Sequence, residues 1–485
     1  MVLDSDAAYL ALQARDARFD GRLFVGVTST GVYCRPVCRV RTPRRENCRF
    51  FDTRAQAEAA AFRPCLKCRP EIAPGLSHMD SSQALADTAA RWIEHAVHSG
   101  EGMALPVIAE RLGVTDRHLR RIFQAQHGVA PRDYLTTQRL LLAKQLLTDT
   151  AMPVTQVALA SGFDSLRRFN AAFVERYRLN PTALRRAGVS RASERSDAPL
   201  RLAHRPPYDT AAVVGFFERR AVLGVEQVEG LTLRRTLGWL HRGVLLPGWI
   251  TMRFVPERHE VHLETSPNLS PVLGALMQRV RQALDLDADP ALIDPVMALL
   301  PVPHSEGTRL PGGLDGFEIA VRVILGQQVT VKAARTLVQR LVNRFGLPIE
   351  TPFAALTHVF PDAATLAAAA AEDIGTLGIV RQRVKALQAL AAAVASGELQ
   401  LHRTAPLEAT LDALRALPGI GDWTAQVIAM RALAWPDAWP ASDIGLMNAL
   451  GSRDIQHITA QAEAWRPWRA YAVMRLWHHL ETTTP

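Results

Sequence analysis

The spacing of four cysteines near the N-terminus constrains this chain more than any other feature of its sequence. Cys34 and Cys38 form one pair and Cys65 and Cys68 form a second, with twenty-six residues between the pairs. Paired thiols with short internal spacing and a longer gap predict a closed tetrahedral zinc site, with one Zn²⁺ per chain. The spacing alone favours a structural zinc knuckle over a site with a reactive thiolate, because structural zinc sites need no reactive ligand.

The residues around these cysteines are mostly basic. They are Arg35, Arg39, Arg41, Arg44, Arg45, Arg49, Arg54, Arg63, Lys67 and Arg69, against Glu46, Asp52 and Glu58. A zinc ion that carries four thiolates has a net charge of about −2, which nearby arginines offset. An arginine-rich metal module suits a phosphate backbone better than a protein partner. The net charge of the whole chain, +9, also favours a polyanionic partner.

The segments GVYCRPVCRVRTPRRENCRFF and FRPCLKCRPE closely resemble the N-terminal domain of the Ada family of DNA repair regulators, over about residues 1–75. The resemblance implies that Cys34 accepts a methyl group from a methylated backbone phosphate while the other three cysteines remain zinc ligands. Zinc would keep the sulfur deprotonated and nucleophilic. Methylation would remove one negative charge, so DNA affinity should rise. Cys48 falls outside the paired spacing and is expected to be a buried or free thiol.

Length and composition predict several domains in one soluble chain of 485 residues. All five cysteines lie before residue 70, and thiols in a metal-binding pattern indicate a reducing compartment. The first residues carry acids where a secretory signal would carry lysines, and no apolar run reaches membrane length. We therefore expect a cytoplasmic, bacterial, nucleoid-associated protein. Segments 71–80 and 187–199 have the composition of linkers, which places domains at 1–75, at 81–186 and from about 200 onward.

Two helix-turn-helix units are predicted, at 105–124 and 153–173. In each unit, apolar residues keep helical spacing up to a glycine, and a capping residue begins the next helix. The glycines and caps are Gly113 with Thr115, and Gly162 with Asp164. One long helix would connect the units. The second helix of each unit directs basic and polar groups outward, so it can enter the major groove.

For either unit alone, an ordinary helical bundle with a solvated basic face is an equal alternative. Two copies joined by one helix, and the segment GFDSLRRFNAAFVERYRLNPTALRR, resemble the DNA-binding domain of the AraC family over about 85–186. The resemblance implies sequence-specific promoter binding, with RNA polymerase as a further partner. The side chains expected to reach DNA are Arg117, Arg120, Arg167 and Arg168.

The remaining chain combines a strand-rich segment with a helical one. Residues 231–265 alternate in the manner of strands, helices are expected at 209–221 and 268–286, and from about 300 the pattern is almost all helix. There, LPGIGDWTAQVIAMRA predicts a tight hairpin whose backbone N–H groups would face a phosphate. Taken alone, this is also the pattern of a plain helix–helix turn, and Asp443 in WPASDIGLMNAL would be an ordinary helix N-cap.

The hairpin, an aspartate about twenty residues later and WRPWRAYAVMRLW together resemble the helix-hairpin-helix DNA glycosylase superfamily. The match is closest to the AlkA-type 3-methyladenine DNA glycosylases II, over about 205–480. It implies an AlkA-like α+β subdomain at 205–300 and a glycosylase domain at 301–485, with Asp443 as the catalytic aspartate.

Two departures from other members of that superfamily narrow the expected chemistry. Some relatives carry four cysteines for an iron–sulfur cluster after the catalytic domain, whereas no cysteine follows Cys68 here, so no cluster is expected. Bifunctional relatives carry a lysine in the hairpin that forms a Schiff base with the sugar, and Trp423 takes that position. The resemblance therefore implies a monofunctional enzyme that leaves an abasic site without strand cleavage.

The resemblance also implies a pocket for a base that has left the duplex. Aromatic faces grip a cationic alkylated base, and we predict that Trp423, Trp465 and Tyr471 form this pocket while Trp468 and Trp477 pack in the core. Gln328, in ILGQQV, takes the position of the wedge that fills the vacated stack, where relatives can carry an apolar residue. The hairpin residues expected to contact DNA are Gly419, Gly421 and Thr424.

These parts predict a multidomain α+β protein: a zinc-binding Ada-like domain, an all-α AraC-type double helix-turn-helix, an AlkA-like α+β subdomain and a helix-hairpin-helix glycosylase α domain. We expect a monomer that binds damaged and promoter duplex DNA, accepts methyl groups at Cys34 and hydrolyses the N-glycosidic bond of alkylated bases with Asp443. Two alternatives remain open. One is a methyl-sensing activator with an inactive glycosylase-like domain, and the other is a glycosylase whose N-terminal modules only attach it to DNA. The PCHR-type motif of the second Ada methyltransferase domain is missing, so no O6-methylguanine repair is expected.

Overall fold

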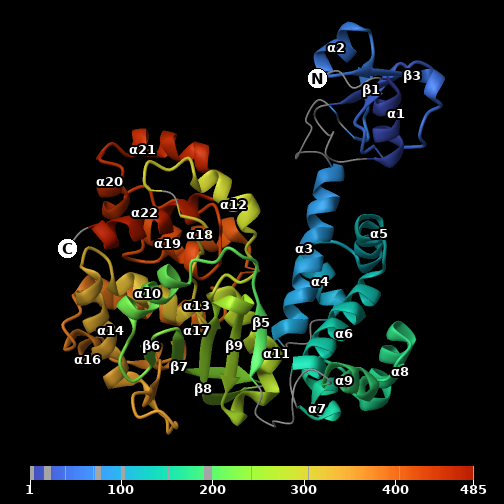
Figure 1. The fold of residues 1–485 in the computed structure, drawn as a ribbon. Helices are drawn as coiled ribbons and strands as arrows, with labels where there is room; N and C mark the ends of the chain where they lie inside the picture. The colour runs from blue at the N-terminus through green and yellow to red at the C-terminus, as the bar shows by residue number, and fades with distance from the viewer. Residues whose placement is uncertain are drawn as a thin grey trace. The chain divides into compact units, whose positions relative to one another are not determined.

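The computed structural model describes eleven stretches of the chain. These are residues 5–15, 23–38, 40–68, 70, 78–99, 104–149, 152–189, 199–241, 243–303, 305–403 and 405–483. Figure 1 shows the fold. The chain forms two compact units, one of residues 1–94 and 103–137 and the other of 95–102 and 138–485. In the part of the chain described, none of the helices combines the length and apolar character needed to span a membrane.

The N-terminal domain is built on a small sheet in the order β3-β1-β2-β4, with two helices. Its elements are α1 (Ser5–Ala14), β1 (Phe24–Val27), β2 (Val32–Cys34), β3 (Cys48–Phe51), α2 (Arg54–Ala59) and β4 (Arg63–Pro64). β1 pairs antiparallel with β2 and β3, and β2 pairs parallel with β4. Because β2 ends at Cys34 and Cys65 directly follows β4, the sheet brings the two cysteine pairs together.

Helices alone form the next segment. They are α3 (His78–Ser99), α4 (Leu105–Arg111), α5 (Asp116–His127), α6 (Pro131–Asp149), α7 (Val154–Ala160), α8 (Leu166–Tyr177) and α9 (Pro181–Val189). The two predicted helix-turn-helix units are confirmed as α4–α5 and α7–α8, and α6 is the connecting helix. Thr115 caps α5 as predicted, by accepting from His118 N–H. Ser165, and not the predicted Asp164, caps α8 by accepting from Arg168 N–H.

The predicted linkers, 71–80 and 187–199, lie mostly outside the described residues. Their edges differ from the prediction, because α3 already begins at His78 and α9 runs to Val189. Good helix formers such as Met79, Gln83 and Ala84 follow the Pro-Gly pair, so α3 begins inside the segment that composition alone marked as a linker.

A five-stranded antiparallel sheet in the order β5-β9-β8-β7-β6 follows. Its strands and neighbouring helices are β5 (Leu200–Ala203), α10 (Thr210–Arg220), β6 (Glu226–Glu229), β7 (Thr232–His241), β8 (Val244–Val255), β9 (Glu260–Thr265), α11 (Leu273–Ala283) and α12 (Pro290–Met297). The predicted strands at 231–265 are confirmed as β7, β8 and β9. The short edge strands β5 and β6 were not predicted, because β5 alternates over only four residues and β6 does not alternate.

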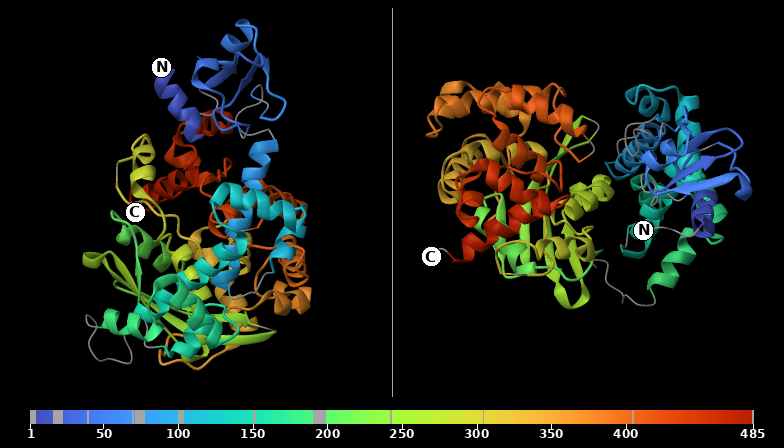
Figure 2. Two further views of the ribbon diagram at one scale, coloured as in Figure 1. Left: turned by 90° about the vertical axis from the view of Figure 1, so that its right-hand side faces the viewer. Right: turned by 90° about the horizontal axis from the view of Figure 1, so that it is seen from above.

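The rest of the chain is helical except for one short strand pair. Its elements are α13 (Gly316–Leu325), α14 (Val331–Phe345), β10 (Leu347–Pro348), β11 (His358–Val359), α15 (Ala363–Ala368), α16 (Ala371–Gly375), α17 (Arg381–Ala395), α18 (Leu407–Ala416), α19 (Asp422–Arg431), α20 (Ile444–Ala449), α21 (Ile455–Ala462) and α22 (Arg469–Thr483). In Figure 1 and in the left-hand view of Figure 2, the green strands lie below the red helices α20–α22. The buried cores around Ile324 and Ile428 and around Trp465 hold these helices together.

Candidate active site, metal centre and DNA-binding surfaces

Asp443 occupies a position with two functions in the structure. As the N-cap of α20 its Oδ1 accepts from the N–H of Leu446, 2.9 Å away, which satisfies one unpaired donor of the helix end. Oδ1 also accepts from Trp477 Nε1 at 2.9 Å, and Oδ2 accepts from Trp423 Nε1 at 2.8 Å. Three N–H donors thus fix the carboxylate, and Oδ2 keeps a lone pair for another partner.

The carboxylate lies at the wall of a pocket of about 330 Å³. Trp423 from α19, Trp477 from α22 and Phe216 from α10 line this pocket together with apolar residues of α13 and α14. Aromatic and aliphatic walls around one fixed carboxylate are suited to a flat, electron-poor ring. Trp423, which we predicted to form the base pocket, lines this pocket and donates directly to Asp443.

Two residues predicted for the base pocket lie elsewhere. Trp465 is 1% exposed and packs edge-on against Trp439 in the core. Tyr471 is buried and donates to Asp285 Oδ2 at 2.8 Å. Trp465 lies in a short 3-10 helix, Glu463–Trp465, that precedes α22. α22 directs Tyr471 and Trp477 to different sides, and of these two only Trp477, which we predicted to pack in the core, lines the pocket. A sequence signal was Gly445: a Cβ there would lie 3.2 Å from the Trp477 ring, so glycine leaves room for a large side chain.

The predicted hairpin connects α18 and α19. Gly419 has φ +77, a left-handed conformation that favours glycine. Among the described residues no side chain caps the start of α19, so N–H groups of its first turn are available to an anion. Thr424 was predicted to contact DNA, but its side chain is 2% exposed and its Oγ1 accepts from Gln327 Nε2 at 2.9 Å. Gln327 Nε2 also donates to Gly419 O at 3.0 Å, so the Thr424 side chain supports the hairpin from inside.

The predicted wedge residue lies in the turn between α13 and α14. Gln328 is exposed and has φ +53, a left-handed conformation that few residues other than glycine adopt. Its neighbour Gln327 binds the hairpin, and Arg383 donates to the Gln327 carbonyl oxygen. Gln327 thus fixes the turn through its hydrogen bonds with the hairpin and Arg383, while Gln328 is exposed to solvent.

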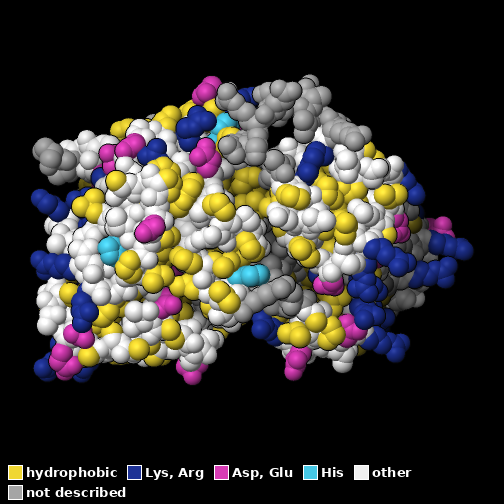
Figure 3. All heavy atoms as spheres, turned by 90° about the horizontal axis from the view of Figure 1, so that it is seen from below, with side chains coloured by type: hydrophobic (Ala, Val, Ile, Leu, Met, Phe, Trp, Pro, Cys, Tyr) yellow, Lys and Arg dark blue, Asp and Glu magenta, His cyan; other side chains and the backbone are white. Residues whose placement is uncertain are grey.

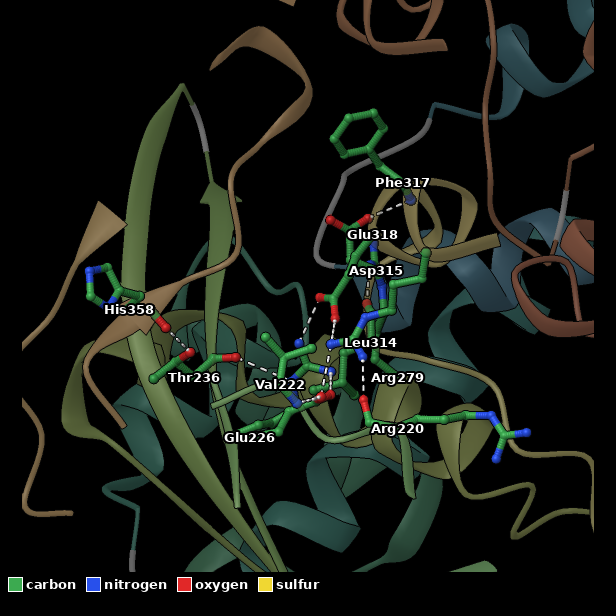
Figure 4. A network of polar contacts seen from close by, with 12 residues as sticks. Arg220, Val222, Glu226, Thr236, Arg279, Leu314, Asp315, Phe317, Glu318 and His358 are labelled. Atoms are coloured by element: carbon green, nitrogen blue, oxygen red, sulfur yellow. Dashed lines mark hydrogen bonds and ion pairs between the residues drawn. The ribbon is translucent and has the colours of Figure 1, made fainter. Parts of the chain in front are cut away.

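A buried ionic network lies behind the pocket (Figure 4). Arg322 donates to Glu226 at 2.8 Å and pairs with Glu318 at 2.6 Å, and Arg235 contacts the same two carboxylates at 3.0 and 2.7 Å. Burial raises the pKa of Glu318, but Arg235 and Arg322 outweigh burial and hold that pKa below its usual value. The network connects α13 to the sheet strands β6 and β7 and fixes the rear wall of the pocket.

The four cysteines of the N-terminal domain converge as predicted. Cys34, Cys38, Cys65 and Cys68 are all buried, and their Sγ atoms lie within 4.8 Å of one another. The fully buried Arg35 donates to Cys68 O at 3.4 Å, and its backbone N–H lies 3.5 Å from Cys68 Sγ. Four clustered thiols with a buried cation beside them fit a Zn²⁺ ion with thiolate ligands. Cys48 lies apart from this cluster, buried against Leu12 and Val25.

Four family models match successive parts of the chain. They are the metal binding domain of Ada at residues 7–71, a helix-turn-helix domain at 108–187, the AlkA N-terminal domain at 199–315 and the HhH-GPD superfamily base excision DNA repair protein at 321–468. A probable bifunctional transcriptional activator/DNA repair enzyme AlkA of Mycobacterium tuberculosis is 37% identical over 99% of this chain and 97% of its own length. The chain belongs to this bifunctional AlkA family.

Other relatives match separate parts of the chain. DNA-3-methyladenine glycosylase 2 of Escherichia coli is 32% identical over 56% of this chain and 94% of that protein. The bifunctional transcriptional activator/DNA repair enzyme Ada of Escherichia coli is 30% identical over 35% of this chain and 46% of that protein. Membership of the bifunctional AlkA family thus rests on a match that covers all the predicted parts of the chain. The predicted multidomain α+β fold class is confirmed.

The bifunctional AlkA chain presents the predicted DNA-reading arginines on the second helix of each helix-turn-helix unit. Arg117 and Arg120 on α5, and Arg167 and Arg168 on α8, are exposed. Arg120 pairs with Asp116 at 2.7 Å, and Arg168 lies 3.8 Å from Asp164. Figure 3 shows Lys and Arg side chains gathered at one edge of the face that it draws. These four arginines remain predictions for contacts with DNA.

Proposed function

We propose that this protein detects methyl damage on DNA, activates repair genes and excises alkylated bases such as 3-methyladenine. The observation that carries the enzymatic part is the Asp443 carboxylate, held by the indole N–H groups of Trp423 and Trp477 at an aromatic pocket beside the hairpin. The observation that supports the sensory part is the buried cluster of four cysteines on an arginine-rich domain.

The proposed excision reaction follows from the charge that develops on the sugar. The bond between the anomeric carbon and the base nitrogen breaks, and its electron pair leaves with the base, which neutralises an N3- or N7-alkylated purine. The sugar becomes oxocarbenium-like, and the Asp443 carboxylate stabilises that charge. Water then adds to the anomeric carbon and gives up a proton, which Asp443 can accept. The indole of Trp423 cannot form a Schiff base, so the product is an abasic site in an intact strand.

Access to the base requires that it leave the duplex. We assign the phosphate contacts to the hairpin at Gly419–Gly421 and the filling of the vacated stack to Gln328. Support comes from the exposed, left-handed position of Gln328 and from Gln327, which joins this turn to the hairpin.

The proposed sensory reaction is a methyl transfer to Cys34. The sulfur–carbon bond forms as the methyl carbon–oxygen bond of the phosphotriester breaks, and the electron pair of that bond stays on the phosphate. Cys34, Cys38, Cys65 and Cys68 would hold Zn²⁺, and its positive charge would keep the sulfur deprotonated. Cys38, Cys65 and Cys68 hold the geometry. The proposal includes one Zn²⁺ per chain, no iron–sulfur cluster, a monomer acting on chromosomal DNA, and RNA polymerase as the partner in activation.

The deciding experiment measures free bases released from methylated duplex DNA by the intact chain and by Asp443→Asn. We expect release of 3-methyladenine by the intact chain and a loss of roughly 10²-fold or more in the variant, as for other removed electrostatic groups. Asp454→Asn is the matched control, because Asp454 caps the following helix α21 and does not line the pocket. No release by the folded, zinc-loaded intact chain would reduce the protein to a methyl-sensing activator.

A further inference from the structure

Four arginines line the base pocket: Arg220, Arg322, Arg335 and Arg431. Arg335 is exposed to solvent, and among the other three Arg431 differs in its partners. Arg220 pairs with Glu481 at 2.9 Å, and Arg322 pairs with Glu226 and Glu318. Arg431 also lines the pocket, but no carboxylate of the described chain lies within ion-pair distance of it. Its guanidinium donates only long hydrogen bonds, to Pro311 O at 3.4 Å and Gly312 O at 3.5 Å.

The Arg431 guanidinium is nevertheless held in place. It lies 4.9 Å from the ring centroid of Phe216, and the Arg220 guanidinium lies 4.0 Å from the same ring. Burial, and then the neighbouring Arg220 and Arg322, lower the pKa of Arg431 to about 9, so Arg431 is still a cation at neutral pH. A buried cation without a carboxylate is unfavourable, and a ligand that offers an acceptor would relieve that cost.

Arg431 is also placed to meet the base. Trp423, Val427 and Arg431 follow one another at four-residue spacing on α19, so they share one face of the helix, and all three line the pocket. The face of α19 that carries Arg431 is therefore also the face that carries Trp423, the residue that donates to Asp443.

We propose that Arg431 is a specificity-determining residue that donates hydrogen bonds to a carbonyl oxygen of the flipped base. Keto purines such as 7-methylguanine would then be favoured over amino purines such as 3-methyladenine. A guanidinium pairs well with the O6 acceptor of guanine, which is still present when N7 is methylated, whereas the exocyclic amino group of adenine presents N–H donors to it. This inference rests on the proposed function, because it requires the base to enter this pocket.

The first test compares the release of 7-methylguanine and 3-methyladenine from one preparation of methylated duplex DNA, in single turnovers. Relative to the intact chain, Arg431→Met should lower the rate of 7-methylguanine release, divided by that of 3-methyladenine release, by roughly ten-fold or more. This is the loss expected for a hydrogen bond to a charged group. Arg279→Met is the matched control. Arg279 also donates to a carbonyl oxygen, that of Leu314, and lies 4.8 Å from the Trp239 ring, but it does not line the pocket.

The outcomes separate the two proposals. An intact chain that releases neither base contradicts the proposed function. An intact chain that releases both, with the same ratio in Arg431→Met, overturns the role of Arg431 and leaves the proposed function standing. A second measurement needs no variant: free 7-methylhypoxanthine should inhibit the intact chain several-fold more strongly than free 7-methyladenine, which carries an amino group in place of the carbonyl oxygen. Equal inhibition would overturn the role of Arg431 even if Arg431→Met failed to fold.

Discussion

At the residue scale, the chemistry of Asp443 depends on the groups that hold it. A helix N-cap needs only one donor for its carboxylate, yet this one accepts from two indole N–H groups as well. The two tryptophans come from α19 and α22, so the carboxylate is fixed by elements far apart in the sequence. A Cβ at Gly445 would lie 2.9 Å from Asp443 Oδ1, so even the residue beside the cap is constrained by the carboxylate.

Trp477→Phe tests this arrangement. The phenylalanine ring keeps most of the pocket wall but removes the N–H that donates to Asp443 Oδ1, so the carboxylate loses a charge-assisted hydrogen bond. We expect base release to slow by about ten-fold or more, measured in single turnovers on methylated duplex DNA. Trp468→Phe, at a ring that packs edge-on against Tyr471 in the core, should leave the rate nearly unchanged. Equal rates for Trp477→Phe and the intact chain would show that the hydrogen bond does not contribute.

At the scale of elements, Asp285 connects the end of α11 to α22. Its Oδ2 accepts from Tyr471 Oη at 2.8 Å and from Leu310 N–H at 3.0 Å. Burial raises the pKa of Asp285 to about 6, above an ordinary value of about 3.9. A carboxyl group whose folded pKa is raised binds more protons in the folded than in the unfolded chain between these values. Its contribution to stability is therefore largest below about pH 4 and is lost as the pH rises toward 6.

Asp285→Asn removes this titration but keeps the acceptor, and asparagine tolerates the left-handed φ of +51 at this position. The free energy of unfolding of the variant, relative to the intact chain, should rise by up to about 3 kcal/mol between pH 4 and pH 7. Urea unfolding followed by tryptophan fluorescence measures it, because eight of the nine tryptophans lie after residue 199. Asp287→Asn changes a half-exposed acid beside Arg281 and should show no such rise. If the free energy of unfolding of Asp285→Asn depended on pH in the same way as that of the intact chain, the raised pKa of Asp285 would be contradicted.

The same elements show what the sequence could and could not predict. Helical spacing, glycine turns and caps located α4–α5, α7–α8, the hairpin and α20, because those signals are local. The cysteine spacing located the metal centre for the same reason. The pocket could not be completed in this way, since Trp477 and Tyr471 lie on one helix and only the packing of α22 against α20 and α12 decides which of them reaches Asp443. The sequence did not indicate a role for Arg431, because only the folded structure shows that no carboxylate of the described residues lies beside its guanidinium.

At the scale of the whole molecule, the proposed sensor can act on DNA affinity through charge alone. Methylation of Cys34 removes one negative charge from a basic domain, and DNA repulsion falls accordingly. Affinity for a fixed duplex, measured by fluorescence anisotropy, should rise by roughly ten-fold after incubation with DNA that contains methylphosphotriesters. Cys34→Ala with preserved zinc content should not respond. Cys48→Ser should respond fully, because the Cys48 thiol lies outside the cluster and donates to Arg44 O at 3.3 Å.

Cys34→His distinguishes the effect of losing a negative charge from the effect of the added methyl group. Histidine is a neutral zinc ligand and Cys₃His sites are stable, so this variant should bind zinc, accept no methyl group and lack the same negative charge that methylation removes. If the switch is electrostatic, Cys34→His binds DNA before any exposure to methylated DNA about as tightly as the methylated intact chain. The difference in DNA affinity between Cys34→His and the unmethylated intact chain should decrease as the salt concentration is raised, because salt screens the charge. A zinc-loaded Cys34→His with the affinity of the unmethylated chain would mean that the methyl group acts by reshaping the domain, and that charge is not the signal.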